Sequence, residues 1–168
     1  MVRGLPQLKA SSKICTDCMV GKQHRDALPK RSLWRATQRL QLVHADIDGP
    51  IKSLSNSKKR YFISFIHDYS RKVWINFLAE KSEAFPIFKN FKNIIEKETE
   101  DFIRCLRIDR GGEFTSHEFN IFCKTNSISR QLTAAYTLQQ NGVAERKNIT
   151  IMNMVRSILS EKQVPKNF

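Results

Sequence analysis

The stretch YFISFIHDYSRKVWINFLA, residues 61–79, decides the fold class of this chain. It contains two runs rich in β-branched and aromatic residues, YFISFIHD and KVWINFLA, joined by the short polar connection YSR. Runs of this composition on either side of a short polar turn are typical of antiparallel strands. Residues 61–79 therefore predict two neighbouring strands of an antiparallel meander.

A third strand precedes these two. Residues 40–47, LQLVHADI, are apolar and rich in branched side chains, and the turn pair Gly49 and Pro50 closes the run. The basic, polar segment 52–60 then reads as a turn that leads back into the strand beginning at Tyr61. The sheet is thus predicted to begin with three strands.

Helices and strands alternate in the second half of the chain. Residues 81–100 place phenylalanine and isoleucine at three- and four-residue steps, which predicts an amphipathic helix with Ser82 as its N-cap and Pro86 in its first turn. A strand over 102–109, a short helix from near Ser116 and a strand over 127–135 follow. This order predicts an α/β fold with a mixed five-stranded sheet flanked by helices.

The last predicted helix runs from about Asn141 to Glu161. Its expected core-facing stripe consists of Ala144, Ile151, Val155 and Ile158, at steps of seven, four and three residues. Glu145 is expected at the edge between this stripe and solvent.

The charge of the chain favours a polyanionic partner. Lys and Arg number 29 against 16 Asp and Glu, a formal net charge of +13 over 168 residues, which makes nucleic acid the first candidate. Residues 1–39 carry nine of the basic residues and two of the acidic ones. We therefore expect a basic lead-in, residues 1–39, ahead of a core formed by residues 40–168.

The sequence lacks the signatures of membrane insertion and secretion. It has no unbroken apolar run long enough to span a bilayer, and residues 1–11 lack the apolar centre of a signal peptide. The four cysteines are too sparse for a disulfide scaffold and suit a reducing compartment. We expect a soluble, intracellular protein.

Three acidic residues occupy distinctive points of this predicted fold. Asp46 interrupts an apolar strand, where a carboxylate loses its solvation at a cost of several kcal/mol unless other groups compensate. Taken singly, Asp109 before RGG is typical of a turn residue, and Glu145 is typical of a first-turn acid favoured by the helix dipole. Converging at one sheet edge, however, the three would repel one another unless they held cations. Together they predict a Mg²⁺ or Mn²⁺ site, and on so basic a protein the expected substrate is a phosphodiester.

Four stretches resemble the integrase catalytic core of copia-type retrotransposon Pol polyproteins. They are LVHADIDGP, YFISFIHDYSRKVWINFLAEKSEAFPIFKNFK, LRIDRGGEFTSHEFNIFC and QLTAAYTLQQNGVAERKNITIMNMVRSIL, which together span most of the chain. Thirty-five residues separate Asp109 from Glu145, the spacing of the D,D-35-E retroviral integrase superfamily.

The resemblance implies a ribonuclease H-like fold, with Asp46, Asp109 and Glu145 as the catalytic metal ligands. It implies an enzyme that processes DNA 3′ ends and transfers them to target DNA. It further implies DNA as partner, a homo-oligomer when the protein is complete, and action at chromatin in the nucleus after assembly in the cytoplasm.

Several other residues have both a functional and a structural interpretation. Gln140, Asn141, Arg146 and Lys147 are candidate DNA contacts. A turn and an N-cap are compatible with this role for Gln140 and Asn141, whereas Arg146 and Lys147, taken singly, are more typical of solvated surface charges. His44 shares the strand face of Asp46 and is interpreted either as a structural histidine or as a group that orients a ligand. Asp48 is predicted to be a turn acid, Asp68 to be structural with Arg71 as its partner, and Glu113 to support the site.

Residues 1–39 also contain the pair Cys15 and Cys18. A structural zinc ion needs four ligands, and related integrases have two histidines upstream of such a pair, whereas this chain offers only His24 after it. We interpret the pair as the remnant of an integrase zinc-binding domain, expect no zinc in this fragment, and interpret the core as C-terminally truncated.

Two further functions remain open at this stage. The chain could be a catalytically silent nucleic-acid-binding remnant of a retrotransposon, which would bind DNA in a salt-sensitive way without cleaving it. It could also be a ribonuclease H-like nuclease, which a comparison of RNA–DNA hybrids with DNA ends would distinguish.

Overall fold

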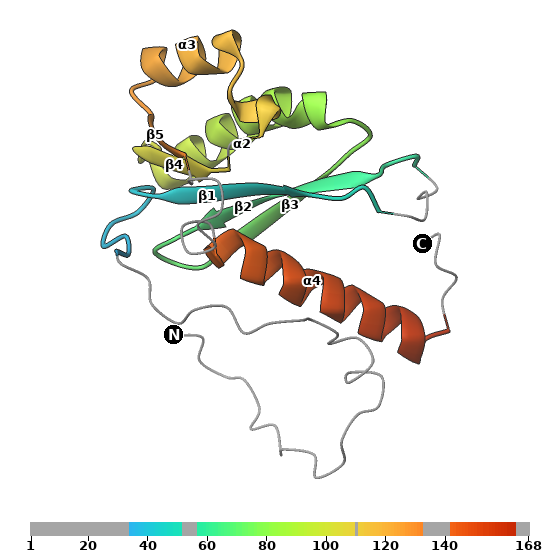
Figure 1. The fold of residues 1–168 in the computed structure, drawn as a ribbon. Coiled ribbons are helices and arrows are strands. Elements are labelled where there is room, and N and C mark those ends of the chain that lie inside the picture. Colours follow the sequence, from blue (N-terminus) through green and yellow to red (C-terminus); the bar gives the residue numbers. More distant parts are fainter. Residues whose placement is uncertain (1–33, 52–56, 110, 133–141, 164–168) are drawn as a thin grey trace.

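A computed structural model describes residues 34–51, 57–109, 111–132 and 142–163 of the chain (Figure 1). It contains a five-stranded sheet in the order β3-β2-β1-β4-β5. The strands are β1 (Val43–Asp48), β2 (Tyr61–His67), β3 (Val73–Leu78), β4 (Cys105–Ile108) and β5 (Ser129–Leu132).

The directions of the strands confirm the predicted mixed sheet. The pairs β1–β2 and β2–β3 are antiparallel, so the first three strands form the expected meander. The pairs β1–β4 and β4–β5 are parallel, as expected for strands joined by helical connections. The fold is therefore α/β, and β1 lies at its centre with an antiparallel neighbour on one side and a parallel one on the other.

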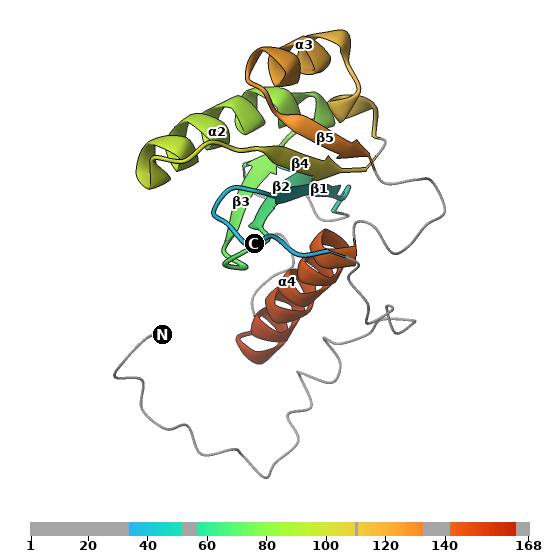
Figure 2. The same ribbon diagram turned by 90° about the vertical axis from the view of Figure 1, so that its left-hand side faces the viewer.

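Helices cover both faces of the sheet. The helical elements are the short turns η1 (Lys81–Glu83) and η2 (Gly112–Phe114) and the helices α2 (Ala84–Thr99), α3 (His117–Thr125) and α4 (Gly142–Glu161). Helices α2 and α3 lie on one side, and α4 lies alone on the other (Figures 1 and 2). This arrangement makes three layers in which α4 packs against β1 and β2.

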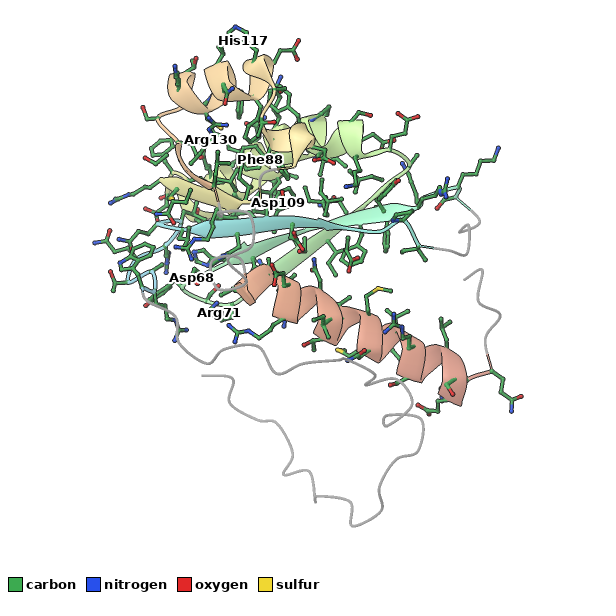
Figure 3. The ribbon with its side chains drawn as sticks, in the orientation of Figure 1. Asp68, Arg71, Phe88, Asp109, His117 and Arg130 are labelled. Atoms are coloured by element: carbon green, nitrogen blue, oxygen red, sulfur yellow. The ribbon has the colours of Figure 1, made fainter. Side chains whose placement is uncertain are left out.

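An aromatic core fills the space between the sheet and α2. Phe65 of β2 stacks on Phe91 of α2, with ring centroids 4.3 Å apart. Phe88 and Phe119 extend the cluster toward α3, with centroids 5.6 Å apart, and both are fully buried. Burying a side chain of this size contributes about 1.5–3 kcal/mol. The side chains of Phe88 and Asp68 lie on opposite sides of the sheet (Figure 3).

Of the two helices on this face, α3 begins with a side-chain N-cap and α2 does not. Helix α3 starts near Ser116 as predicted; Ser116 is its N-cap, and its Oγ accepts a hydrogen bond from the Phe119 amide at 3.2 Å. The prediction of Ser82 as the N-cap of α2 is wrong, because α2 begins after η1 and the Ser82 hydroxyl donates to Glu80 instead. Pro86 does lie in the first turn of α2.

The prediction of an apolar, core-facing stripe on α4 is wrong for most of its residues. Ala144 is buried, but Val155 and Ile158 are 43% and 53% exposed. The side of α4 that faces the molecule instead carries small and amide residues, Gly142, Ala144, Asn148 and Asn153. No helix in the described residues is both long enough and apolar enough to cross a membrane.

Candidate active site

Three elements bring Asp46, Asp109 and Glu145 to one edge of the sheet. In the parallel pair β1–β4, Val43 is opposite Leu106 and His44 is opposite Arg107. The same offset sets Asp46 level with Asp109, which directly follows β4. Glu145 lies in the first turn of α4, which packs against β1. The carboxylates therefore approach one another although 98 residues separate the first from the last in the chain.

The electrostatics of Asp46 reflect this convergence. Burial and then the negative charges of Asp109, Glu145 and Asp48 raise the pKa of Asp46 from 3.8 to about 7. A hydrogen bond from Asn148 acts in the opposite direction but does not outweigh them. Burial also raises the pKa of Glu145; the charge of Arg146 opposes this effect and that of Asp109 reinforces it.

Asn148 contacts the site directly, and the sequence analysis missed it. Its Nδ2 donates to Asp46 Oδ2 at 2.8 Å, and the residue is 2% exposed. Its Oδ1 makes no hydrogen bond within the described residues, and neither does the buried hydroxyl of Ser64, directly opposite Asp46 on β2. The sequence did contain a signal for Asn148, because it lies three residues after Glu145 and therefore on the same side of the helix.

The loop after β4 fixes Asp109. The Gly111 amide donates to Asp109 Oδ1 at 3.0 Å, which folds the chain back around the carboxylate. Glu113, in the same loop, pairs with Lys81 at 3.2 Å. Asp109 itself is exposed and therefore accessible to a substrate.

The chemistry of these donors suits a hard divalent cation. Mg²⁺ prefers carboxylate and water oxygens, and the site offers carboxylates from three separate elements. Within the part of the chain that the structure describes, however, no group of three or more His, Cys, Asp or Glu side chains is arranged to hold a metal ion. The carboxylates of Asp46 and Asp109 instead accept hydrogen bonds from Asn148 and Gly111. Metal binding would therefore require these side chains to reorient toward a common point.

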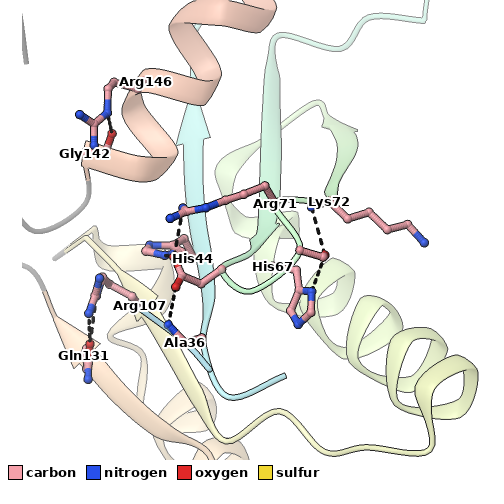
Figure 4. A network of polar contacts seen from close by, with 11 residues as sticks. Ala36, His44, His67, Arg71, Lys72, Arg107, Gln131, Gly142 and Arg146 are labelled. Atoms are coloured by element: carbon pink, nitrogen blue, oxygen red, sulfur yellow. Dashed lines mark hydrogen bonds and ion pairs between the residues drawn. The ribbon is translucent and has the colours of Figure 1, made fainter. Parts of the chain in front are cut away.

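A second buried acid, Asp68, has the opposite environment. Its carboxylate accepts hydrogen bonds from the Ala36 amide at 2.7 Å and from His44 Nε2 at 2.9 Å, and it pairs with Arg71 at 3.1 Å. Figure 4 shows these groups converging from three segments. Burial alone would raise the pKa of Asp68, but the bonds from His44 and Ala36 and the charge of Arg71 lower it to about 2. The prediction that Asp68 is structural and pairs with Arg71 is confirmed.

The structure also distinguishes the interpretations of His44 and Asp48. His44 is fully buried and bonds to Asp68, which supports its structural interpretation. The prediction of Asp48 as a turn acid is wrong, because β1 continues through Asp48. It consequently shares the strand face of Asp46 and adds to the charge that raises the pKa of Asp46.

The structure describes two of the four predicted DNA-contacting residues, Arg146 and Lys147. Arg146 is exposed, and its Nε donates to the Gly142 carbonyl at 2.8 Å, one turn earlier in α4. Lys147 is half-buried on the same helix. Gln140, Asn141, Cys15 and Cys18 lie outside the described residues.

Comparison with known proteins identifies the class to which this fold and this site belong. The profile of the integrase core domain matches residues 36–137, more than half of the chain. The chain therefore belongs to the integrase core domain family.

Its relatives are retrotransposon polyproteins. The chain is 42% identical over 156 residues to a retrovirus-related Pol polyprotein from transposon TNT 1-94 of Nicotiana tabacum, covering 93% of this chain and 12% of the relative. It is 30% identical over 167 residues to the Pol polyprotein from transposon RE2 of Arabidopsis thaliana, covering 98% of this chain and 11% of the relative. The chain thus spans about a tenth of the length of these curated relatives.

A solved structure supports the fold. A chain from the cryo-electron microscopy structure of a simian T-cell lymphotropic virus intasome, in complex with the PP2A regulatory subunit B56 gamma, superposes with a TM-score of 0.66. The match covers 90% of this chain and 52% of that chain at 16% identity. The predicted ribonuclease H-like fold is thereby confirmed.

Proposed function

We propose that this chain is the catalytic core of a metal-dependent polynucleotidyl transferase, which processes DNA 3′ ends and transfers them to target DNA. The observation that carries the proposal is the convergence of Asp46, Asp109 and Glu145 from three separate elements. Membership of the integrase core domain family and the net charge of +13 support DNA as the substrate.

Both reactions are in-line displacements at phosphorus. In end processing the oxygen of water forms the new P–O bond, and in strand transfer the 3′-hydroxyl oxygen forms it. In each case a second P–O bond breaks, and the leaving oxygen takes up a proton. A single site therefore serves both steps, because only the attacking group differs.

Different residues of the chain would hold the metal, orient its ligands and bind the DNA. Asp46, Asp109 and Glu145 would hold Mg²⁺ or Mn²⁺, which when bound activates the attacking oxygen and stabilises the leaving one. Asn148 keeps the Asp46 carboxylate oriented through its 2.8 Å hydrogen bond. Arg146 and Lys147, just behind Glu145, bind DNA phosphates, and Gln140 and Asn141 contact the DNA from the preceding segment.

The proposal extends to assembly and location. Joining DNA ends to a target requires several DNA segments to be held together, which favours a homo-oligomer in the complete protein. Such a reaction takes place at chromatin, so we propose that the functional protein is assembled in the cytoplasm and acts in the nucleus. The segment that contains Cys15 and Cys18 is related to the zinc-binding domain of integrases.

A joining assay with a short DNA duplex tests the function. The wild-type protein is expected to nick and join the duplex in Mg²⁺ or Mn²⁺ and to lose both activities in a chelator. Asp109→Asn should reduce them by at least about a hundredfold, because it removes a charged ligand. Glu118→Gln, on the exposed side of α3, is the matched control and should leave activity unchanged. Full activity in Asp109→Asn would overturn the proposal.

A second candidate, a DNA-binding domain without catalysis, is favoured by one observation. The three carboxylates are not already arranged as a metal site within the described residues. This candidate predicts salt-sensitive DNA binding with no metal-dependent cleavage. An RNA–DNA hybrid, included as a second substrate, would separate DNA joining from ribonuclease H-like cleavage.

A further inference from the structure

A fourth carboxylate, that of Glu113, lies beside Asp109 across Gly111. A methyl group placed on the Gly111 Cα would collide with Glu113 Oε2 and would lie 3.0 Å from Asp109 Oδ1. The two carboxylates therefore both lie on the side of the Gly111 Cα where a side chain would stand. The φ and ψ of Gly111, −57° and 143°, suit any residue, so it is this crowding and not backbone strain that makes glycine suitable here.

The backbone on either side of Glu113 is firmly anchored. The next residue, Phe114, is fully buried, and its ring packs 5.4 Å from that of Phe119. Its carbonyl accepts a hydrogen bond from Arg130 at 3.1 Å, and its amide donates to the Gly111 carbonyl at 3.2 Å. The position of Glu113 relative to Asp109 is thus fixed by the core.

The two oxygens of Glu113 have different surroundings. Oε1 pairs with Lys81 Nζ at 3.2 Å, and the side chain is only 16% exposed. Oε2 instead points toward Gly111 and Asp109, although a second negative charge is unfavourable there. Lys81 compensates this charge from one side, which leaves Oε2 available as an acceptor on the side of Asp109.

An acceptor in this position suits a hydrated cation. Mg²⁺ usually retains several of its waters when carboxylates bind it, and these waters donate hydrogen bonds to groups outside the ligand set. Such outer groups typically contribute 10–100-fold to metal affinity or activity.

We propose that Glu113 is a positioning residue of the metal site, whose Oε2 accepts hydrogen bonds from the hydration water of a divalent cation at Asp109. Lys81 holds the carboxylate in place through its other oxygen. The inference rests on the proposed function, because it needs a cation at Asp109. In addition to the elements that carry the three carboxylates, η1 would thus contribute to metal binding, because its Lys81 holds Glu113.

The test is direct binding of Mn²⁺ to the 168-residue protein, measured from the electron paramagnetic resonance signal of free Mn²⁺. Glu113→Gln should raise the Kd for Mn²⁺ about tenfold or more and leave the melting temperature without metal nearly unchanged. Glu83→Gln is the matched control, because Glu83 also pairs with a lysine, Lys59, at 3.2 Å. It should bind Mn²⁺ like the wild type.

Gly111→Ala provides a second, independent variant. Its methyl group would displace Glu113 from Asp109 while the Glu113 charge is retained. It should also weaken Mn²⁺ binding, and by at least as much as Glu113→Gln, because the methyl group crowds Asp109 as well as Glu113.

The outcomes separate the two proposals. If Asp109→Asn abolishes Mn²⁺ binding while Glu113→Gln and Gly111→Ala stay within twofold of the wild-type Kd, the role of Glu113 is overturned and the proposed function stands. Equal weakening by Glu113→Gln and Glu83→Gln would also overturn that role, because it would indicate an effect of overall charge. A wild-type protein that binds no Mn²⁺ would overturn both.

Discussion

Replacing Asp46 with asparagine should stabilise the metal-free protein while it abolishes DNA joining. The pKa of Asp46 rises from 3.8 to about 7 through burial and the charges of Asp109, Glu145 and Asp48. One pKa unit corresponds to about 1.4 kcal/mol, so the ionised carboxylate destabilises the fold by at most about 4 kcal/mol. Because Asp46 is partly exposed, solvent screening reduces the expected gain to about 2 kcal/mol.

The pH dependence follows from the sign of this change. Native Asp46 binds its proton more tightly than the unfolded chain does, so the penalty is absent below about pH 4, grows up to about pH 7 and is complete above it. The variant should therefore melt about 4–8 °C above the wild type at pH 8. At pH 4 the two proteins should melt together. The asparagine can still accept the hydrogen bond from Asn148.

Mg²⁺ should make the wild type more stable than Asp46→Asn, the reverse of the order without metal. A ligand at a hundred times its Kd stabilises the native state by about 2.7 kcal/mol, and only the protein with Asp46 intact should gain this. Thermal melts at pH 8 with and without Mg²⁺ measure both effects. If Asp46→Asn lowers the melting temperature without metal, the charge of Asp46 is structural and the reasoning is wrong.

The remaining predictions concern other parts of the molecule. Asp68→Asn should lower the free energy of unfolding at pH 7 by roughly 3–5 kcal/mol in urea titrations, because it breaks a buried charge network. The wild type should lose this advantage as the pH falls from about 4 to about 2, because the pKa of Asp68 is lowered in the native state. Ser116→Ala should cost about 1 kcal/mol through loss of the α3 cap, whereas Ser82→Ala, which caps no helix, should cost little. Arg146→Ala and Lys147→Ala should each reduce the slope of log K for DNA binding against log salt concentration by about 0.9, whereas Lys124→Ala on α3 should not.

The strands β2 and β3 could be predicted from the sequence because their composition favours strands and the short turn between them determines how they pair. The two runs around YSR form β2 and β3, paired from Tyr61 opposite Leu78 to Ile66 opposite Val73. A short polar turn between β-rich runs specifies both the pairing and its direction without any distant contact. The fold class therefore follows from residues 61–79 and the alternation after them.

Helix α4 could not be predicted in the same way. Counting apolar residues favours a face with Ile151, Val155 and Ile158, but α4 packs with Ala144 and Asn148 toward β1. Asn148 is buried because Asp46 offers it a hydrogen-bond acceptor, and that acceptor comes from a strand 102 residues away. A helix that packs over a charged strand buries amides, and hydrophobic periodicity cannot detect this.

The comparison of Asp46 with Asp68 indicates how the acid that we propose as a metal ligand differs from the structural one. Asp46 lies in β1 and Asp68 directly follows β2, and both carboxylates lose solvation on folding. Donors from Ala36, His44 and Arg71 lower the pKa of Asp68 to about 2, so its ionised form stabilises the fold. Burial and the neighbouring acids raise the pKa of Asp46 to about 7, so its ionised form opposes folding, and a bound cation would offset this penalty. The residue type and the loss of solvation are alike in the two cases, and the groups that the fold places around each carboxylate separate the two roles.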